Sequence, residues 1–127
     1  MTSAKLEHVN VTVSDSRTSA KLYCELFGWK VRWHGEAING GYTYHVGTDD
    51  QYVALYSSTK ESKEKPGGYE MVGRLNHIAV VVDDIDAMDE RIKAAGYKTF
   101  NHGDYEPGRR FYFYDDDDIE IEVVSYL

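Results

Sequence analysis

This chain of 127 residues lacks several features that would place it in a secreted, membrane or nucleic-acid-binding class. Its only cysteine is Cys24, so an intrachain disulfide is excluded and a reducing compartment is favoured. Its 14 basic and 22 acidic side chains give a net charge of −8, which argues against nucleic acid or an anionic membrane as a partner. No apolar run approaches the roughly 18 residues of a membrane span. The composition therefore predicts a soluble, cytoplasmic protein.

A short passage occurs twice in the chain, at residues 6–13 and 75–82. Each copy carries a histidine in third place, His8 and His77, 69 positions apart (77 − 8). After a slip of one residue the similarity continues at an offset of 68, which matches Tyr44 with Tyr112 (112 − 44). Such a repeat indicates that one folding unit is used twice, with the two imidazoles at equivalent points.

The first module, about residues 5–58, is expected to follow the order β-α-β-β-β. Alternating apolar and polar residues predict a half-buried strand at 6–13. Ser14 or Asp15 can cap a helix that runs to about Phe27, with Gly28 beyond its end. Turn residues then separate three predicted strands, at 29–36, 42–46 and 52–57.

The second module, about residues 74–127, is expected to repeat this order after a polar linker at about 59–73. Its predicted elements are a strand at 75–82, a helix at 85–95 and strands near 97–101, 110–114 and 119–126. We therefore expect a single α+β domain. Its two modules would form curved sheets around an open cleft, with helices on the outer faces.

The last predicted strand separates apolar and acidic side chains onto opposite faces. Ile119, Ile121 and Val123 share one face, which we expect a helix to cover. Glu120 and Glu122 share the other face. The same alternation in the two first strands leaves the histidines on the uncovered face. Each of these carboxylates or imidazoles alone is typical of an ordinary polar surface. The repeat is the reason to consider them together, because it places both histidines at the same position of their modules.

His8, His77 and Glu122 together could bind one metal ion through mixed nitrogen and oxygen donors. Neutral imidazoles and a carboxylate favour Fe(II), Mn²⁺, Ni²⁺ or Zn²⁺ over Ca²⁺. The Asp115–Asp118 run is better explained as a hairpin turn, because it lacks the spacing and the glycine of a calcium loop.

The two modules, the paired histidines and the ending Ile119-Glu120-Ile121-Glu122 resemble the vicinal oxygen chelate superfamily. This superfamily includes glyoxalase I, methylmalonyl-CoA epimerase, extradiol dioxygenases, and the fosfomycin- and bleomycin-resistance proteins. The resemblance extends from Leu6 to Tyr126. It departs from the usual Asp-Pro-Asp-Gly turn, where this chain has Asp115–Asp118.

The resemblance implies four positions that face the cleft in metal-binding members: His8, Ala54, His77 and Glu122. Glyoxalase I and the epimerase place Glu or Gln where this chain has Ala54, so the resemblance leaves three ligands. Two histidines and one carboxylate are similar to the iron-binding triad of extradiol dioxygenases. Tyr112, ten residues before Glu122 (122 − 112), matches the active-site tyrosine of that signature.

Two functions follow as alternatives. The first is a metal-dependent enzyme that acts on a small substrate with two adjacent oxygens, by dioxygenase-like or by glyoxalase- or lyase-like chemistry, with Tyr112 as a catalytic acid or hydrogen-bond donor. The second is a metal-free protein that sequesters a flat ligand in an aromatic cleft, as bleomycin-resistance members do. A homodimer is expected in either case. The cleft is predicted to be lined by Asn10, Tyr44, Tyr52, Ala54, Tyr56 and Arg110.

Overall fold

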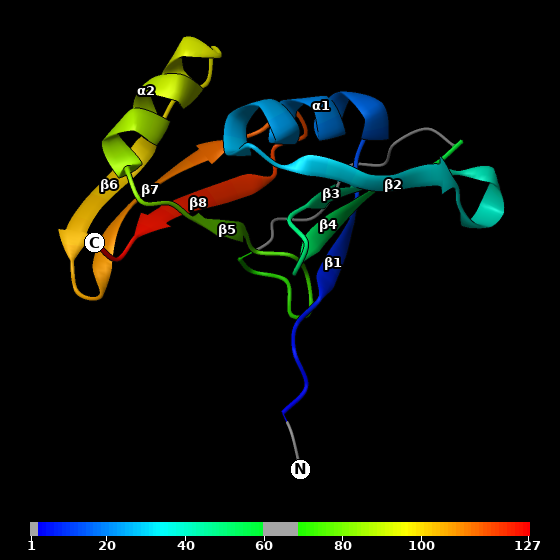
Figure 1. Ribbon diagram of the computed structural model, residues 1–127, viewed down its shortest axis with the longest axis horizontal. Coiled ribbons are helices and arrows are strands. Elements are labelled where there is room, and N and C mark those ends of the chain that lie inside the picture. Colours follow the sequence, from blue (N-terminus) through cyan, green and yellow to red (C-terminus); the bar gives the residue numbers. More distant parts are fainter. Residues whose placement is uncertain (1–2, 60–68) are drawn as a thin grey trace. The chain divides into compact units, whose positions relative to one another are not determined.

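The computed structural model describes residues 3–59 and 69–127. The chain divides into two compact units, Met1–Lys63 and Glu64–Leu127. The described part of each unit contains one α-helix and one four-stranded sheet in the order β-α-β-β-β (Figure 1). The α+β fold class is therefore confirmed. Most of the linker expected at 59–73 lies outside the described residues.

The sheet of the first unit has the strand order β1-β4-β3-β2. Strand β1 runs parallel to β4, and the other neighbours are antiparallel. A short 3₁₀ turn, Ile38–Gly40, connects β2 to β3, where the sequence predicted a simple turn. The elements are β1 (His8–Thr12), α1 (Ser16–Phe27), β2 (Lys30–Glu36), β3 (Tyr42–Gly47) and β4 (Tyr52–Ser57).

Helix α1 begins and ends at residues that the sequence marks as caps. The Asp15 carboxylate accepts hydrogen bonds from the amides of Arg17 and Thr18, which satisfies donors that the helix itself leaves free. Gly28 ends the helix in the left-handed region, with φ 68°, where a side chain would be strained. The Ser57 hydroxyl of β4 donates to the Ser16 hydroxyl at 2.9 Å, so α1 covers the sheet face on which Ser57 lies.

The second unit repeats this arrangement, with the strand order β5-β8-β7-β6 and β5 parallel to β8. Strand β6 begins three residues later than the sequence predicted. The Tyr97 amide still donates to the Ile92 carbonyl at the end of the helix, so Tyr97 does not pair in the sheet, and the strand begins at Phe100. The elements are β5 (Ile78–Val81), α2 (Ile85–Ala94), β6 (Phe100–Tyr105), β7 (Gly108–Tyr114) and β8 (Glu120–Ser125).

Each sheet buries one face beneath its helix. In the second unit this face carries fully buried apolar side chains from β7 and β8: Phe111, Phe113, Ile121 and Val123. In the first unit it carries Val46, Val53 and Leu55. We call the opposite side of each sheet its open face. Within residues 3–59 and 69–127, no helix is long and apolar enough to cross a membrane.

Candidate functional site

The open face of the second unit gathers the polar residues that the sequence singled out. Glu122 of β8 pairs with Tyr112 of β7 on one side and with Ala79 of β5 on the other. Because paired residues in a sheet point to the same side, all three leave the sheet on the open face. His77, two residues before Ala79, projects from that side as well and reaches Glu122.

His77, Glu122 and Arg110 form a chain of polar contacts. His77 Nε2 lies 3.1 Å from Glu122 Oε1, and Arg110 Nη1 donates to Glu122 Oε2 at 3.2 Å. Glu122 is only 7% exposed. A carboxylate at this depth needs partners, because burial removes its water. Arg110 therefore holds one oxygen of Glu122 and leaves the other facing the imidazole.

Glu120 lies beside this chain and is also buried. Its Oε2 accepts the hydroxyl of Tyr69 and lies 3.8 Å from His77 Nδ1. Its Oε1 lies 3.5 Å from the Tyr114 hydroxyl. The hydrogen bond to Glu120, and then burial, raise the pKa of Tyr69. Sequence reasoning placed Glu120 on this face without giving it a role. Tyr69 was missed, because nothing local links it to β8, 51 positions away.

Tyr112 contacts the histidine through its ring. The two rings are 6.1 Å apart, edge to face, and the Tyr112 ring also stacks on Phe100. Burial, and then the negative charge of Glu122, raise the pKa of the Tyr112 phenol. The phenol therefore keeps its proton at neutral pH and can donate a hydrogen bond beside His77 and Glu122.

Two donors of this face, His77 and Glu122, lie at a separation that would allow them either to pair with each other or to share a divalent cation. Two ligands bound at about 2.1 Å and at right angles would lie about 3.0 Å apart, and His77 Nε2 and Glu122 Oε1 lie 3.1 Å apart. Glu120 and Glu122 are both buried, and Arg110 supplies one positive charge against them. A cation would balance the remaining negative charge. Within residues 3–59 and 69–127, no three His, Cys, Asp or Glu side chains gather into a metal cluster.

In the first unit, His8 occupies the open face of β1. It is opposite Tyr52 of β4, and the two rings stack at 4.6 Å. Ala54, two residues further along β4, is opposite Asn10 and is 2% exposed. Its position corresponds to that of Glu122 in the second unit, so β4 offers no carboxylate there. Tyr56 lies on the same face, and its hydroxyl donates to the Ile38 carbonyl at 3.1 Å.

Tyr44 was predicted to line the cleft, and the register of β3 argues against this. Tyr44 pairs with Leu55, so it leaves the sheet on the helix-covered face. His45 pairs with Ala54 and lies on the open face instead. The structural counterpart of Tyr112 is therefore His45, at an offset of 67 (112 − 45), because Tyr112 pairs with Glu122 as His45 pairs with Ala54.

His45 belongs to an aromatic series with Trp33, Tyr52 and His8, of which sequence reasoning named Tyr52 and His8 and missed His45 and Trp33. Its ring stacks on Tyr52 at 4.6 Å and lies 5.2 Å from Trp33. Arg32 lies over the Tyr52 ring at 4.5 Å. Burial, and then the charges of His8 and Arg32, lower the pKa of His45. The signal was available in the sequence: Val46 is apolar, so a strand that buries Val46 must turn His45 to the opposite face.

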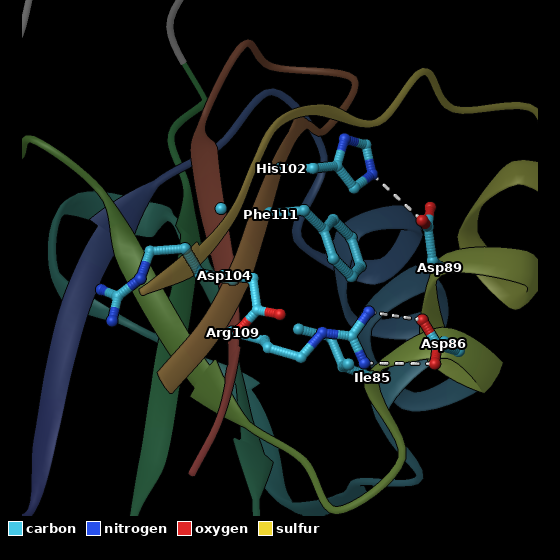
Figure 2. A pocket seen from close by; sticks show the side chains of 9 residues that line it. Ile85, Asp86, Asp89, His102, Asp104, Arg109 and Phe111 are labelled. Atoms are coloured by element: carbon cyan, nitrogen blue, oxygen red, sulfur yellow. Dashed lines mark hydrogen bonds and ion pairs between the residues drawn. The ribbon is translucent and has the colours of Figure 1, made fainter. Parts of the chain in front are cut away.

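A separate pocket of about 300 Å³ lies on the helix-covered side of the second unit. Figure 2 shows the Phe111 ring between two ion pairs that join the sheet to α2. One is His102 with Asp89, at 3.0 Å, and the other is Arg109 with Asp86, at 2.8 Å. The His102 ring also stacks on Phe111.

The His102–Asp89 pair predicts a loss of stability in acid. Burial acts to raise the pKa of Asp89, but hydrogen bonds from Thr99 and His102 outweigh it, and the net shift is downward. The stabilisation is therefore complete above the pKa of an unfolded aspartate, about 4, and disappears as the pH falls through the lower folded value. We expect Asp89→Asn to have a lower free energy of unfolding than wild type near pH 6. We expect this difference between the two proteins to be smaller near pH 3. Urea denaturation at both pH values measures this, and a constant difference would contradict it.

The chain was compared with known proteins by sequence and by structure. The family model described as Glyoxalase/Bleomycin resistance protein/Dioxygenase superfamily matches residues 5–123. A search of curated proteins found no match. Among solved structures, a glyoxylase/bleomycin resistance protein/dioxygenase domain from Frankia sp. EAN1pec is similar, with 22% identity and a TM-score of 0.83. The match covers 98% of this chain and 93% of that one.

Two further similar structures have different stated roles. The fosfomycin resistance protein FosX from Listeria monocytogenes, complexed with Mn(II) and sulfate, has 19% identity and a TM-score of 0.72, covering 98% of this chain and 93% of its own. The antibiotic-binding protein TnmS3 from Streptomyces sp. CB03234 has 20% identity and a TM-score of 0.73, covering 98% of both chains. At these identities the likenesses concern the fold alone. With the family model matching nearly the whole chain, this protein belongs to the glyoxalase/bleomycin resistance protein/dioxygenase superfamily.

Proposed function

We propose that this protein is a metal-dependent enzyme whose ligands are His77, Glu122 and His8. The observation that carries the proposal is the 3.1 Å approach of His77 Nε2 to Glu122 Oε1 on the open face of the second unit, where the carboxylates of Glu120 and Glu122 are both buried. His8 would be the third ligand, contributed by the first unit of the same chain or of a second copy. Fe(II), Mn²⁺, Ni²⁺ and Zn²⁺ suit this donor set.

The substrate class is a small molecule with two adjacent oxygens. When bound, the metal would polarise these oxygens and lower the energy of an enolate or similar anion. Arg110 orients the Glu122 carboxylate through its 3.2 Å hydrogen bond. Tyr112, protonated at neutral pH, would donate a hydrogen bond to the substrate or transfer a proton to it.

A second candidate function is the sequestration of a flat ligand without metal. The observation that favours it is the aromatic series on the open face of the first unit, where the rings of Trp33, His45, Tyr52 and His8 follow one another at 4.6–5.2 Å. Such a series can stack a planar ligand. The Asn10 amide, opposite Ala54, would supply a polar contact.

Thermal denaturation with added ligands separates the two functions. If the enzyme proposal is correct, a chelator lowers the melting temperature of the purified protein, and Fe(II), Mn²⁺ or Zn²⁺ restores it. If planar aromatic compounds alone raise the melting temperature, and the chelator has no effect, the sequestration function stands instead. Size-exclusion chromatography with light scattering, run on the same samples, tests the proposed homodimer.

A further inference from the structure

A β-bulge in β2 places two consecutive side chains on the open face of the first unit. Val31 pairs with Val46, which is buried on the helix-covered face. Trp33 pairs with His45 on the open face, so Arg32 is an extra residue between the two pairs. Without the bulge, alternation would return Trp33 to the face of Val31. Bulges that redirect a side chain in this way are common next to functional sites.

The Trp33 ring is held in place on this face and is still half exposed. It lies 5.2 Å from the His45 ring. It also runs over Gly35, where a Cβ atom would lie 2.8 Å from Trp33 Cζ2, so the glycine leaves the space that the ring occupies. Trp33 is nevertheless 51% exposed. A planar ligand can stack on such a ring.

Arg32 carries a charge beside this ring without a carboxylate partner in the described part of the chain. Within residues 3–59 and 69–127, no salt bridge involves Arg32, although the sequence has 22 acidic side chains. A hydrogen bond from Lys30, and to a smaller extent the charge of Arg32, lowers the pKa of Asp49, and the Asp49 carboxylate is paired with Lys30.

The contact that Arg32 does make leaves its hydrogen-bond donors available. Its guanidinium carbon lies 4.5 Å from the centre of the Tyr52 ring. Stacking on an aromatic ring uses the face of a guanidinium group, and the N–H groups at the edge of the plane remain for an acceptor. Arg32 is also exposed, so a ligand from solution can reach these N–H groups.

We propose that the open face of the first unit binds a flat aromatic carboxylate, whose ring stacks on Trp33 and whose carboxylate accepts hydrogen bonds from Arg32. The proposal rests on the second candidate function, the binding of a flat ligand, and adds the charge of that ligand and the residue that recognises it. The N–H fork of a guanidinium group matches the two oxygens of a carboxylate. Because Arg32 and Trp33 are consecutive and share a face, one small ligand can contact both.

Two compounds that differ in charge, naphthoate and the neutral naphthamide, test this in the full-length protein. Nitrogen-15 NMR follows the indole N–H signals of Trp33 and Trp29 during titration. We expect both compounds to shift the Trp33 signal and naphthoate to bind about 3- to 10-fold more tightly, the range for a charged hydrogen bond exposed to water. Trp29 packs against Tyr23 and Phe27, so its signal is expected to stay in place.

Arg32→Gln is expected to remove the preference for naphthoate and to leave naphthamide binding unchanged. Lys30→Gln is the matched control, because it removes the same charge from the same strand, and it should keep the preference. An equal loss in the two variants, or equal binding of the two compounds by wild type, would overturn the proposal. Equal binding would leave the flat-ligand function standing, whereas no binding of either compound would remove that function and the proposal together.

Discussion

Glu122→Ala is expected to abolish measurable metal binding and to lower the free energy of unfolding by about 3–5 kcal/mol. The stability loss follows from Arg110, whose side chain is 14% exposed and would lose its carboxylate partner. Its Nε and Nη2 atoms already lack a hydrogen-bond partner among the described residues, so the Tyr105 ring, 5.1 Å from the guanidinium carbon, would be left to face the unpaired charge. Calorimetric titration with Zn²⁺ and urea denaturation measure the two effects.

A double variant separates the two effects. When Glu122→Ala is combined with Arg110→Met, the unpaired charge of Arg110 is removed and the Glu122 carboxylate is still absent. We expect it to regain part of the lost stability, because an apolar replacement of a buried ion pair is often tolerated, and to remain unable to bind metal. Wild-type metal affinity in either variant would show that Glu122 is not a ligand.

Phe111→Ala is expected to lower the free energy of unfolding by about 3–5 kcal/mol, the usual cost of emptying an aromatic site in a core. Phe111 is 1% exposed and lies opposite Val123 on the helix-covered face. The ring also stacks against His102 in the pocket of the second unit, so its loss would remove support from the His102–Asp89 pair (Figure 2). Chemical denaturation measures the change.

Tyr112→Phe is the matched control, since it changes the neighbouring residue on the opposite face. It removes only a hydroxyl, and we expect it to cost less than about 1 kcal/mol. If Tyr112→Phe destabilised the protein as much as Phe111→Ala, the register assigned to β7 would be wrong.

The fold could be predicted because the sequence repeats and alternates. The shared segments around His8 and His77 revealed two modules of the same order, and the caps Asp15 and Gly28 gave the limits of α1 within two residues. Alternation in β8 correctly assigned Ile121 to the helix-covered face. The caps and the alternation are local signals, and the repeat needs only a comparison of the sequence with itself.

The positions that could not be predicted depend on register. A constant offset of 68 matched Tyr44 with Tyr112, but the pairing of strands matches His45 with Tyr112. In a sheet, a slip of one residue moves a side chain to the other face. The offset decreases from 69 at the histidines to 67 at β3 and β7 (77 − 8; 112 − 45), because the connections between strands differ in length.

The contacts around Glu120 could not be predicted from the sequence either. Tyr69 reaches it from a segment outside the helices and strands, and Tyr114 from the other side of the β7–β8 turn. Neither contact has a local signature. Alternation did place Glu120 beside Glu122, and two buried carboxylates on one face are themselves an indication of a cation site.

Metal binding by wild type and His77→Ala tests the central claim most directly. Metal-free protein of each kind is titrated with Mn²⁺ and with Zn²⁺ by calorimetry, and elemental analysis follows on the dialysed samples. We predict one metal ion per chain in wild type and binding at least about 100-fold weaker in His77→Ala, because a lost ligand costs more than a lost orienting contact. Equal binding by the two proteins, or no binding by wild type, would contradict the metal site on the open face of the second unit.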